Sequence, residues 1–112
     1  MKGLTMDVSL TVGAIARRAE AIHGRRYVVS RQPSKELERR TYAEAVRRAR
    51  QLAAALRALG VHPGDRVATL AWNHVQHLEA YIGIPLAGAV LHTLNLRLHP
   101  DDLAYIAADA GD

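Results

Sequence analysis

The chain has 112 residues, which is room for one small domain or for part of a larger one. Apolar residues make up 49% of it and charged residues 23%, a composition typical of folded proteins and not of disordered ones. The absence of cysteine excludes a disulfide framework and favours a reducing compartment, so a cytoplasmic location is expected. No apolar run reaches the roughly 18 residues of a membrane-spanning helix, and residues 1–10 are expected to form a disordered leader.

The net charge is +4, and almost all of the basicity comes from arginine. A basic chain can contact nucleic acid or an anionic surface, so a small stand-alone binding module is one hypothesis. The arginine doublets are interleaved with glutamates, and no aromatic platform, zinc motif or helix-turn-helix accompanies them. This pattern favours solvated helix faces and no nucleic-acid partner. The doublets are Arg17-Arg18, Arg25-Arg26, Arg39-Arg40 and Arg47-Arg48.

The first predicted elements are a helix and a loose hairpin. Apolar residues recur at helical spacing over 12–22, with charged residues on the opposite side. A β-rich run at 27–30 is followed by a polar connection containing Pro33 and then by 37–40. The two runs predict the strands of a hairpin.

The clearest predicted helix covers residues 41–59. Thr41 and Glu44 have the spacing of a capping box, in which each side chain satisfies an otherwise unpaired backbone amide. The apolar residues then keep a helical period until Gly60, which ends the helix. These apolar positions are Tyr42, Ala45, Val46, Ala49, Leu52, Ala53, Leu56 and Leu59.

The second half of the chain predicts a β-α-β unit. The apolar runs 66–72 and 89–93 lack polar alternation, so we expect parallel strands buried on both faces. Between them Asn73 is the expected helix cap, and Pro85 is expected to kink the helix or end it early. A last helix should begin near Pro100. The fold class is therefore α/β, with a mixed sheet, a β-α-β unit and flanking helices.

The motifs of nucleotide, metal and nucleophile chemistry are absent from the sequence. The turn 71–74, after the first parallel strand, has no glycine to let a phosphate approach, and no G-x-x-x-x-G-K-[ST] occurs. His74 and His77 could share a helix face, but no third ligand accompanies them, so we expect surface or helix-start histidines and no metal site. Neither a cysteine nor a G-x-S-x-G nucleophile is present, and no catalytic residue is predicted.

Two residues are candidates for facing a ligand or an interface, namely Asn95 and Arg97. They follow the second parallel strand at its carboxyl end, where open α/β sheets place ligands. The alternative is that Asn95 shapes the turn and Arg97 pairs with a carboxylate elsewhere.

A series of short matches, in the right order along the chain, resembles the amino-terminal part of acyl-CoA synthetases. These are the fatty-acid–CoA ligases of the adenylate-forming (AMP-binding) superfamily, and the bacterial medium- and long-chain enzymes are the most similar. The resemblance implies that residues 1–112 are a partial amino-terminal subdomain of the large AMP-binding domain. The segments that carry it are Thr41–Glu44, Leu59–Val61, Gly64–Asn73, Leu78–Tyr81, Gly83–Pro85, Gly88–Asn95 and Leu94–Leu98.

The resemblance also implies what this chain lacks. Such enzymes use ATP and Mg²⁺ to convert a carboxylate to an acyl-adenylate, and then pass the acyl group to CoA. Their phosphate-binding loop with its lysine, their Tyr-Gly-x-Thr-Glu segment, their hinge and their late catalytic lysine have no counterpart in this sequence. We therefore carry over no catalytic, cofactor or metal residue, and we expect neither ATP binding nor activity from this chain alone.

The partners that the resemblance implies are the remainder of the synthetase, a fatty acid as the substrate of the whole enzyme, and a second copy in a homodimer. Relatives continue from here into another strand, so the isolated chain should leave a sheet edge unpaired and an apolar face bare. We expect the isolated chain to be partly molten or to self-associate, and co-expression with the remainder to rescue it.

Overall fold

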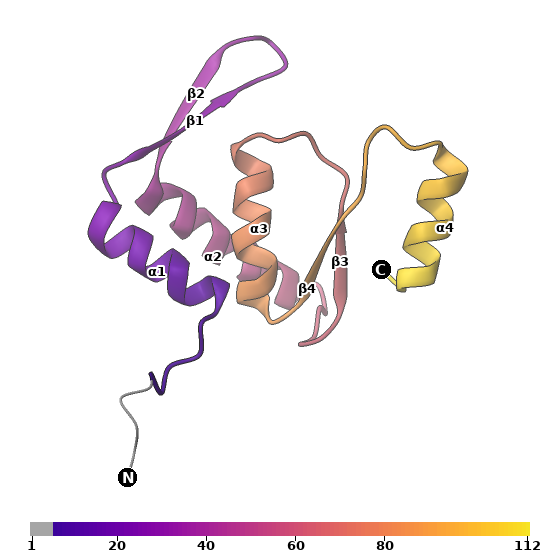
Figure 1. Ribbon diagram of the computed structural model, residues 1–112, viewed down its shortest axis with the longest axis horizontal. Coiled ribbons are helices and arrows are strands. Elements are labelled where there is room, and N and C mark those ends of the chain that lie inside the picture. Colours follow the sequence, from indigo (N-terminus) through magenta and orange to yellow (C-terminus); the bar gives the residue numbers. More distant parts are fainter. Residues whose placement is uncertain (1–5) are drawn as a thin grey trace.

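The computed structural model describes residues 6–112, which form an α/β arrangement of helices around two small sheets (Figure 1). The elements are α1 (Val12–His23), β1 (Tyr27–Arg31), β2 (Leu37–Thr41), α2 (Tyr42–Ala58), β3 (Arg66–Thr69), α3 (Val75–Ala87), β4 (Val90–Thr93) and α4 (Pro100–Ala110). Of the expected leader, residues 1–5 lie outside the described residues. Residues 6–10 are exposed and belong to no helix or strand.

The core lies where α1 and α3 pack against α2. At Gly83 of α3 an added Cβ would lie 2.8 Å from the carbonyl oxygen of Ala49 in α2, so glycine permits the close approach of these two helices. The buried apolar residues of the three helices are Ala16, Ala45, Val46, Ala49, Ala53, Val75, Ile84 and Ala87. Small side chains dominate this core, which is why the helices can lie so close together.

The predicted hairpin and capping box are both confirmed. Strands β1 and β2 pair antiparallel, with Tyr27 opposite Thr41 and Arg31 opposite Leu37. The hydroxyl of Thr41 accepts from the backbone N–H of Glu44 at 3.2 Å, and the Glu44 carboxylate accepts from the Thr41 N–H at 2.8 Å. The strand therefore ends on the residue that caps α2.

The β-α-β unit is also confirmed, since β3 and β4 pair in parallel on either side of α3, with Arg66 opposite Val90 and Thr69 opposite Thr93. Within residues 6–112 this pair and the hairpin form separate two-stranded sheets, and no mixed sheet joins them. The expectation that both strands are buried on both faces is wrong, because Val90 is 53% exposed. Helix α3 contacts one face of this sheet, and the carboxyl end of α4 contacts the other face through Arg66 and His92, which leaves Val90 half exposed.

Helix α3 begins one residue later than expected. His74 is the N-cap in place of Asn73, and its Nδ1 accepts from the backbone N–H of His77 at 3.3 Å. The hydroxyl of Ser30 in β1 accepts from the N–H of Val75 at 3.1 Å. A tertiary contact thus satisfies the first amide of the helix and fixes where it starts.

Pro85 does not end α3 early, because the helix continues to Ala87. The proline lies in the last turn, so the one hydrogen bond that its missing N–H removes, to the carbonyl of Tyr81, is near the end of the helix. Gly88, with a φ of 93°, ends the helix in the left-handed conformation that glycine adopts most readily.

The expected last helix is confirmed as α4, which begins at Pro100 and lies at the far side of the molecule from α1 and the hairpin (Figure 1). None of its residues is buried. Its carboxyl end is tied to the β3–β4 pair by His92 Nδ1, 2.7 Å from Asp112 Oδ2, and by a 3.4 Å hydrogen bond from Arg66 to the carbonyl of Gly111. In the described part of the chain, no helix is long and apolar enough to cross a bilayer.

Candidate functional site

An open hollow of about 320 Å³ lies at the carboxyl ends of β3 and β4. We call it the carboxyl-edge hollow. Two turns and one helix build it: the turn after β3, the turn after β4, and α3 between them. Its polar or aromatic lining residues are Trp72, Asn73, His77, Tyr81, Thr93, Asn95 and Arg97. The topology therefore brings together side chains from both ends of the stretch 71–97, as the parallel pairing requires.

Both sequence-predicted site residues, Asn95 and Arg97, line this hollow. The side-chain oxygen of Asn95 accepts from the backbone N–H of Arg97 at 3.0 Å, so Asn95 also shapes the turn, as in the alternative hypothesis. Arg97 is exposed and forms no salt bridge with any carboxylate of residues 6–112. That either residue faces a ligand remains a prediction.

Sequence reasoning missed His77, which was expected at the surface or helix start but is only 6% exposed. Its Nε2 lies 3.0 Å from the hydroxyl of Thr69 at the end of β3, and its ring meets the edge of Tyr81 with centroids 5.0 Å apart. Its Nδ1 is buried without a hydrogen-bond partner within residues 6–112. The four-residue spacing of His77 and Tyr81 along α3 was the signal that could have grouped them on one face.

The remaining polar groups near the hollow do not form a metal or phosphate site. Within the described residues, no three or more His, Asp or Glu side chains are placed to hold a metal ion. The turn 71–74 presents Ala, Trp, Asn and His where a phosphate cradle needs glycine amides. We therefore derive no nucleotide or metal chemistry from this segment.

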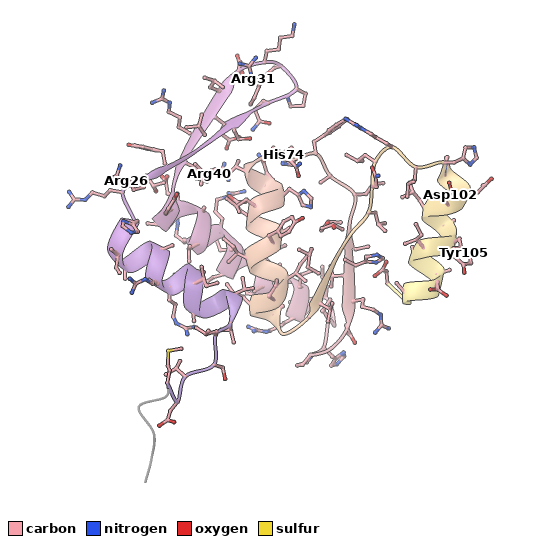
Figure 2. The ribbon with its side chains drawn as sticks, viewed as in Figure 1. Arg26, Arg31, Arg40, His74, Asp102 and Tyr105 are labelled. Carbon is pink, nitrogen blue, oxygen red and sulfur yellow. The ribbon has the colours of Figure 1, made fainter. Side chains whose placement is uncertain are left out.

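A partly buried ion cluster lies on the other side of α3, and sequence reasoning did not predict it. Glu79 is 5% exposed and accepts hydrogen bonds from Arg40 of β2 and, at 3.0 Å, from Arg48 of α2. Arg40 also binds Glu38. Figure 2 shows Arg40 between the hairpin and α3, whereas Arg26 and Arg31 lie at the periphery. The expectation of solvated helix faces is thus wrong for Arg40, which lies on a strand and is 16% exposed.

Residues 15–112 match the profile of the AMP-binding enzyme family, and the chain belongs to this family. It is 54% identical over 107 residues to a long-chain-fatty-acid–CoA ligase of Thermus thermophilus, covering 96% of this chain and 20% of the relative. A medium-chain-fatty-acid–CoA ligase of Ectopseudomonas oleovorans is 42% identical over 112 residues, again with 20% of the relative covered. The chain therefore spans about a fifth of the length of these relatives.

The solved structures agree with this assignment. The N-terminal domain of FACL13 from Mycobacterium tuberculosis matches 93% of this chain with a TM-score of 0.84 at 30% identity, and 26% of that domain is covered. The resemblance to acyl-CoA synthetases and the α/β fold are confirmed. These matches favour the synthetase hypothesis over a stand-alone basic module.

Proposed function

We propose that this chain is the amino-terminal scaffold of a fatty-acid–CoA ligase, which uses ATP and Mg²⁺ to activate a fatty acid and then transfers the acyl group to CoA. The observation that carries the proposal is the similarity to fatty-acid–CoA ligases along nearly the whole chain. The partner of the segment is the remainder of the synthetase, and a homodimer and a cytoplasmic location are part of the same proposal.

The contribution of this segment is to build and hold the carboxyl-edge hollow. Asn95 and Arg97 face a ligand or the remainder of the enzyme there. Support comes from their position at the carboxyl ends of parallel strands and from the guanidinium of Arg97, which is exposed and unpaired among residues 6–112. A positive charge in this position suits an anionic group.

The test is ATP–pyrophosphate exchange with a series of fatty acids, followed by thioester formation with CoA. The full-length product of the gene should show exchange that depends on a fatty acid, and the purified 112-residue chain should show none. Exchange by the short chain alone would contradict the scaffold role. The DNA after the codon for Asp112 should encode, in some frame, a Thr/Ser/Gly-rich loop ending in Lys-Gly, and the lack of any such sequence would count against a ligase.

A further inference from the structure

The hairpin holds one face of α3 by specific polar contacts. The Ser30 hydroxyl accepts from the first helical N–H, that of Val75, in a buried hydrogen bond. One turn later the Glu79 carboxylate accepts from Arg40 of the hairpin and from Arg48 of α2. The hairpin, α2 and α3 therefore converge on a single buried carboxylate.

A second carboxylate extends this contact along the helix. Glu38 of β2 accepts from the Gln76 side chain of α3 at 3.3 Å and from Arg40 and Gln32 of the hairpin. Together with Glu79, these contacts hold the first two turns of α3. We call this set of residues the hairpin clamp: Ser30, Gln32, Glu38, Arg40, Arg48, Gln76 and Glu79.

The opposite face of the same two turns lines the carboxyl-edge hollow. His77 and Tyr81 each lie two residues from Glu79, which places them about 200° around the helix from it. Both side chains also line a second hollow, of about 390 Å³, between β1 and α3. Because a helix moves as a rigid body, a shift of α3 against the hairpin would displace His77 and Tyr81 relative to Asn95 and Arg97.

Stability alone is a poor explanation for Glu79. Desolvating the Glu79 carboxylate and the Arg40 guanidinium opposes the attraction between them, and an apolar side chain could occupy such a position without that cost. The hydrogen bonds of an ion cluster are directional, so they constrain the position and rotation of the helix. In this role Glu79 acts through the helix and need not touch a ligand.

We propose that Glu79 is a positioning residue: its ion pairs with Arg40 and Arg48 fix α3 and thereby set the geometry of the carboxyl-edge hollow that a substrate occupies. The substrate role of the hollow rests on the proposed ligase function. The positioning role rests on the contacts of α3.

The kinetic test uses the full-length synthetase and the substitutions Glu79→Gln and Arg97→Ala, alone and together. Glu79→Gln keeps the shape of the side chain and removes its charge. It should raise roughly tenfold the KM of the substrate that occupies the carboxyl-edge hollow. It should leave kcat within about twofold, because ligand positioning and not the chemical step is disturbed. Arg97→Ala should raise the KM of the same substrate, and the double variant should be no worse than Arg97→Ala alone.

Two further variants make this test decisive. Glu36→Gln, an exposed glutamate of the same hairpin, is the matched control and should leave every KM unchanged. Arg48→Gln removes only the more exposed arm of the cluster, so it should fold even if Glu79→Gln does not, and it should shift the same KM by a smaller factor. An unchanged KM in folded variants, or effects of Glu79→Gln and Arg97→Ala that simply add, would overturn the proposal.

A spectroscopic test separates this proposal from the ligase function. In protein labelled with ¹⁵N-histidine, His77→Gln assigns the imidazole signals of His77, and Glu79→Gln should shift them while Glu36→Gln does not. If the wild-type protein activates no fatty acid, the ligase function fails and this measurement still tests the positioning. Unshifted His77 signals in folded Glu79→Gln protein would refute the positioning role of Glu79.

Discussion

The two sides of the molecule differ in how they are held together. On one side α1, the hairpin, α2 and α3 form a packed region, which contains nearly all of the buried residues and the hairpin clamp. On the other side β3, β4 and α4 form an open region, in which no residue of the two strands or of α4 is buried. Exposed apolar side chains occur in both regions, for example Ile15 in α1 and Val90 in β4. The packed region has the features of a scaffold, whereas the open region supplies two walls of the carboxyl-edge hollow and the residues Asn95 and Arg97.

This difference shows that an apolar pattern predicts a strand more reliably than it predicts burial. The open region has apolar strands of the kind found in covered sheets, yet each of its two strands has an unpaired edge among the described residues. We therefore expect the open region to depend on the remainder of the proposed ligase, and the packed region to depend mainly on its own contacts. Substitutions in each region test this.

A large effect is expected at the contact between α2 and α3. Gly83→Leu would place its side chain against the Ala49 carbonyl and against Leu52, so it should destabilise the fold by about 3 kcal/mol. Urea unfolding followed by circular dichroism measures the change in the free energy of unfolding. Ala54→Leu on the exposed side of α2 is the control and should change the unfolding free energy by less than about 0.5 kcal/mol. A similar effect of both substitutions would mean that the two helices do not pack closely.

The next prediction compares one apolar deletion in each region. Ile84→Ala removes a side chain that is 2% exposed and should cost about 2–5 kcal/mol, because a cavity remains in the packed region. Val90→Ala in β4 removes a half-exposed side chain and should cost less than about 1 kcal/mol. The same unfolding assay applies. Equal losses of unfolding free energy from the two substitutions would show that the open region is as well packed as the packed region.

The smallest effect concerns the capping box that joins the hairpin to α2. Hydrogen bonds from the Thr41 backbone amide and then from its hydroxyl hold the pKa of Glu44 below its usual 4.5. A carboxyl whose pKa is lowered by folding stabilises the protein above the pKa of the unfolded chain, and this contribution is lost as the pH falls through the lower folded value. Glu44→Gln should therefore lower the melting temperature at pH 7 and make little difference well below pH 4.5. A pH-independent difference would contradict the assignment of this effect to the charge of Glu44.

The sequence contains the local features of this fold but little of what depends on distant contacts. The capping box at Thr41, the helical stripes and the parallel pairing of β3 with β4 follow from short-range patterns, and all are confirmed. The start of α3 could not be predicted, because Ser30 satisfies its first amide from another element. The same holds for the exposure of β4, which depends on whether a covering layer is present.

The candidate site was predictable to a similar degree. The rule for parallel strands identified Asn95 and Arg97 as residues at the carboxyl edge, and the structure places both in the hollow. His77 was missed because its burial depends on Thr69 and Tyr81, which only the folded β-α-β unit brings beside it. Glu79 was missed because its partners, Arg40 and Arg48, are 39 and 31 residues away in the chain.

Native-state hydrogen exchange of the 112-residue chain, compared with the same segment in the full-length enzyme, tests the division into two regions most directly. In the short chain the backbone amides of α2 and α3 should be strongly protected, whereas those of β4 and α4 should exchange nearly as fast as in an unfolded peptide. In the full-length enzyme the amides of β4 and α4 should become protected. Equal protection of both regions in the short chain would show that the open region is self-supporting and would contradict this account.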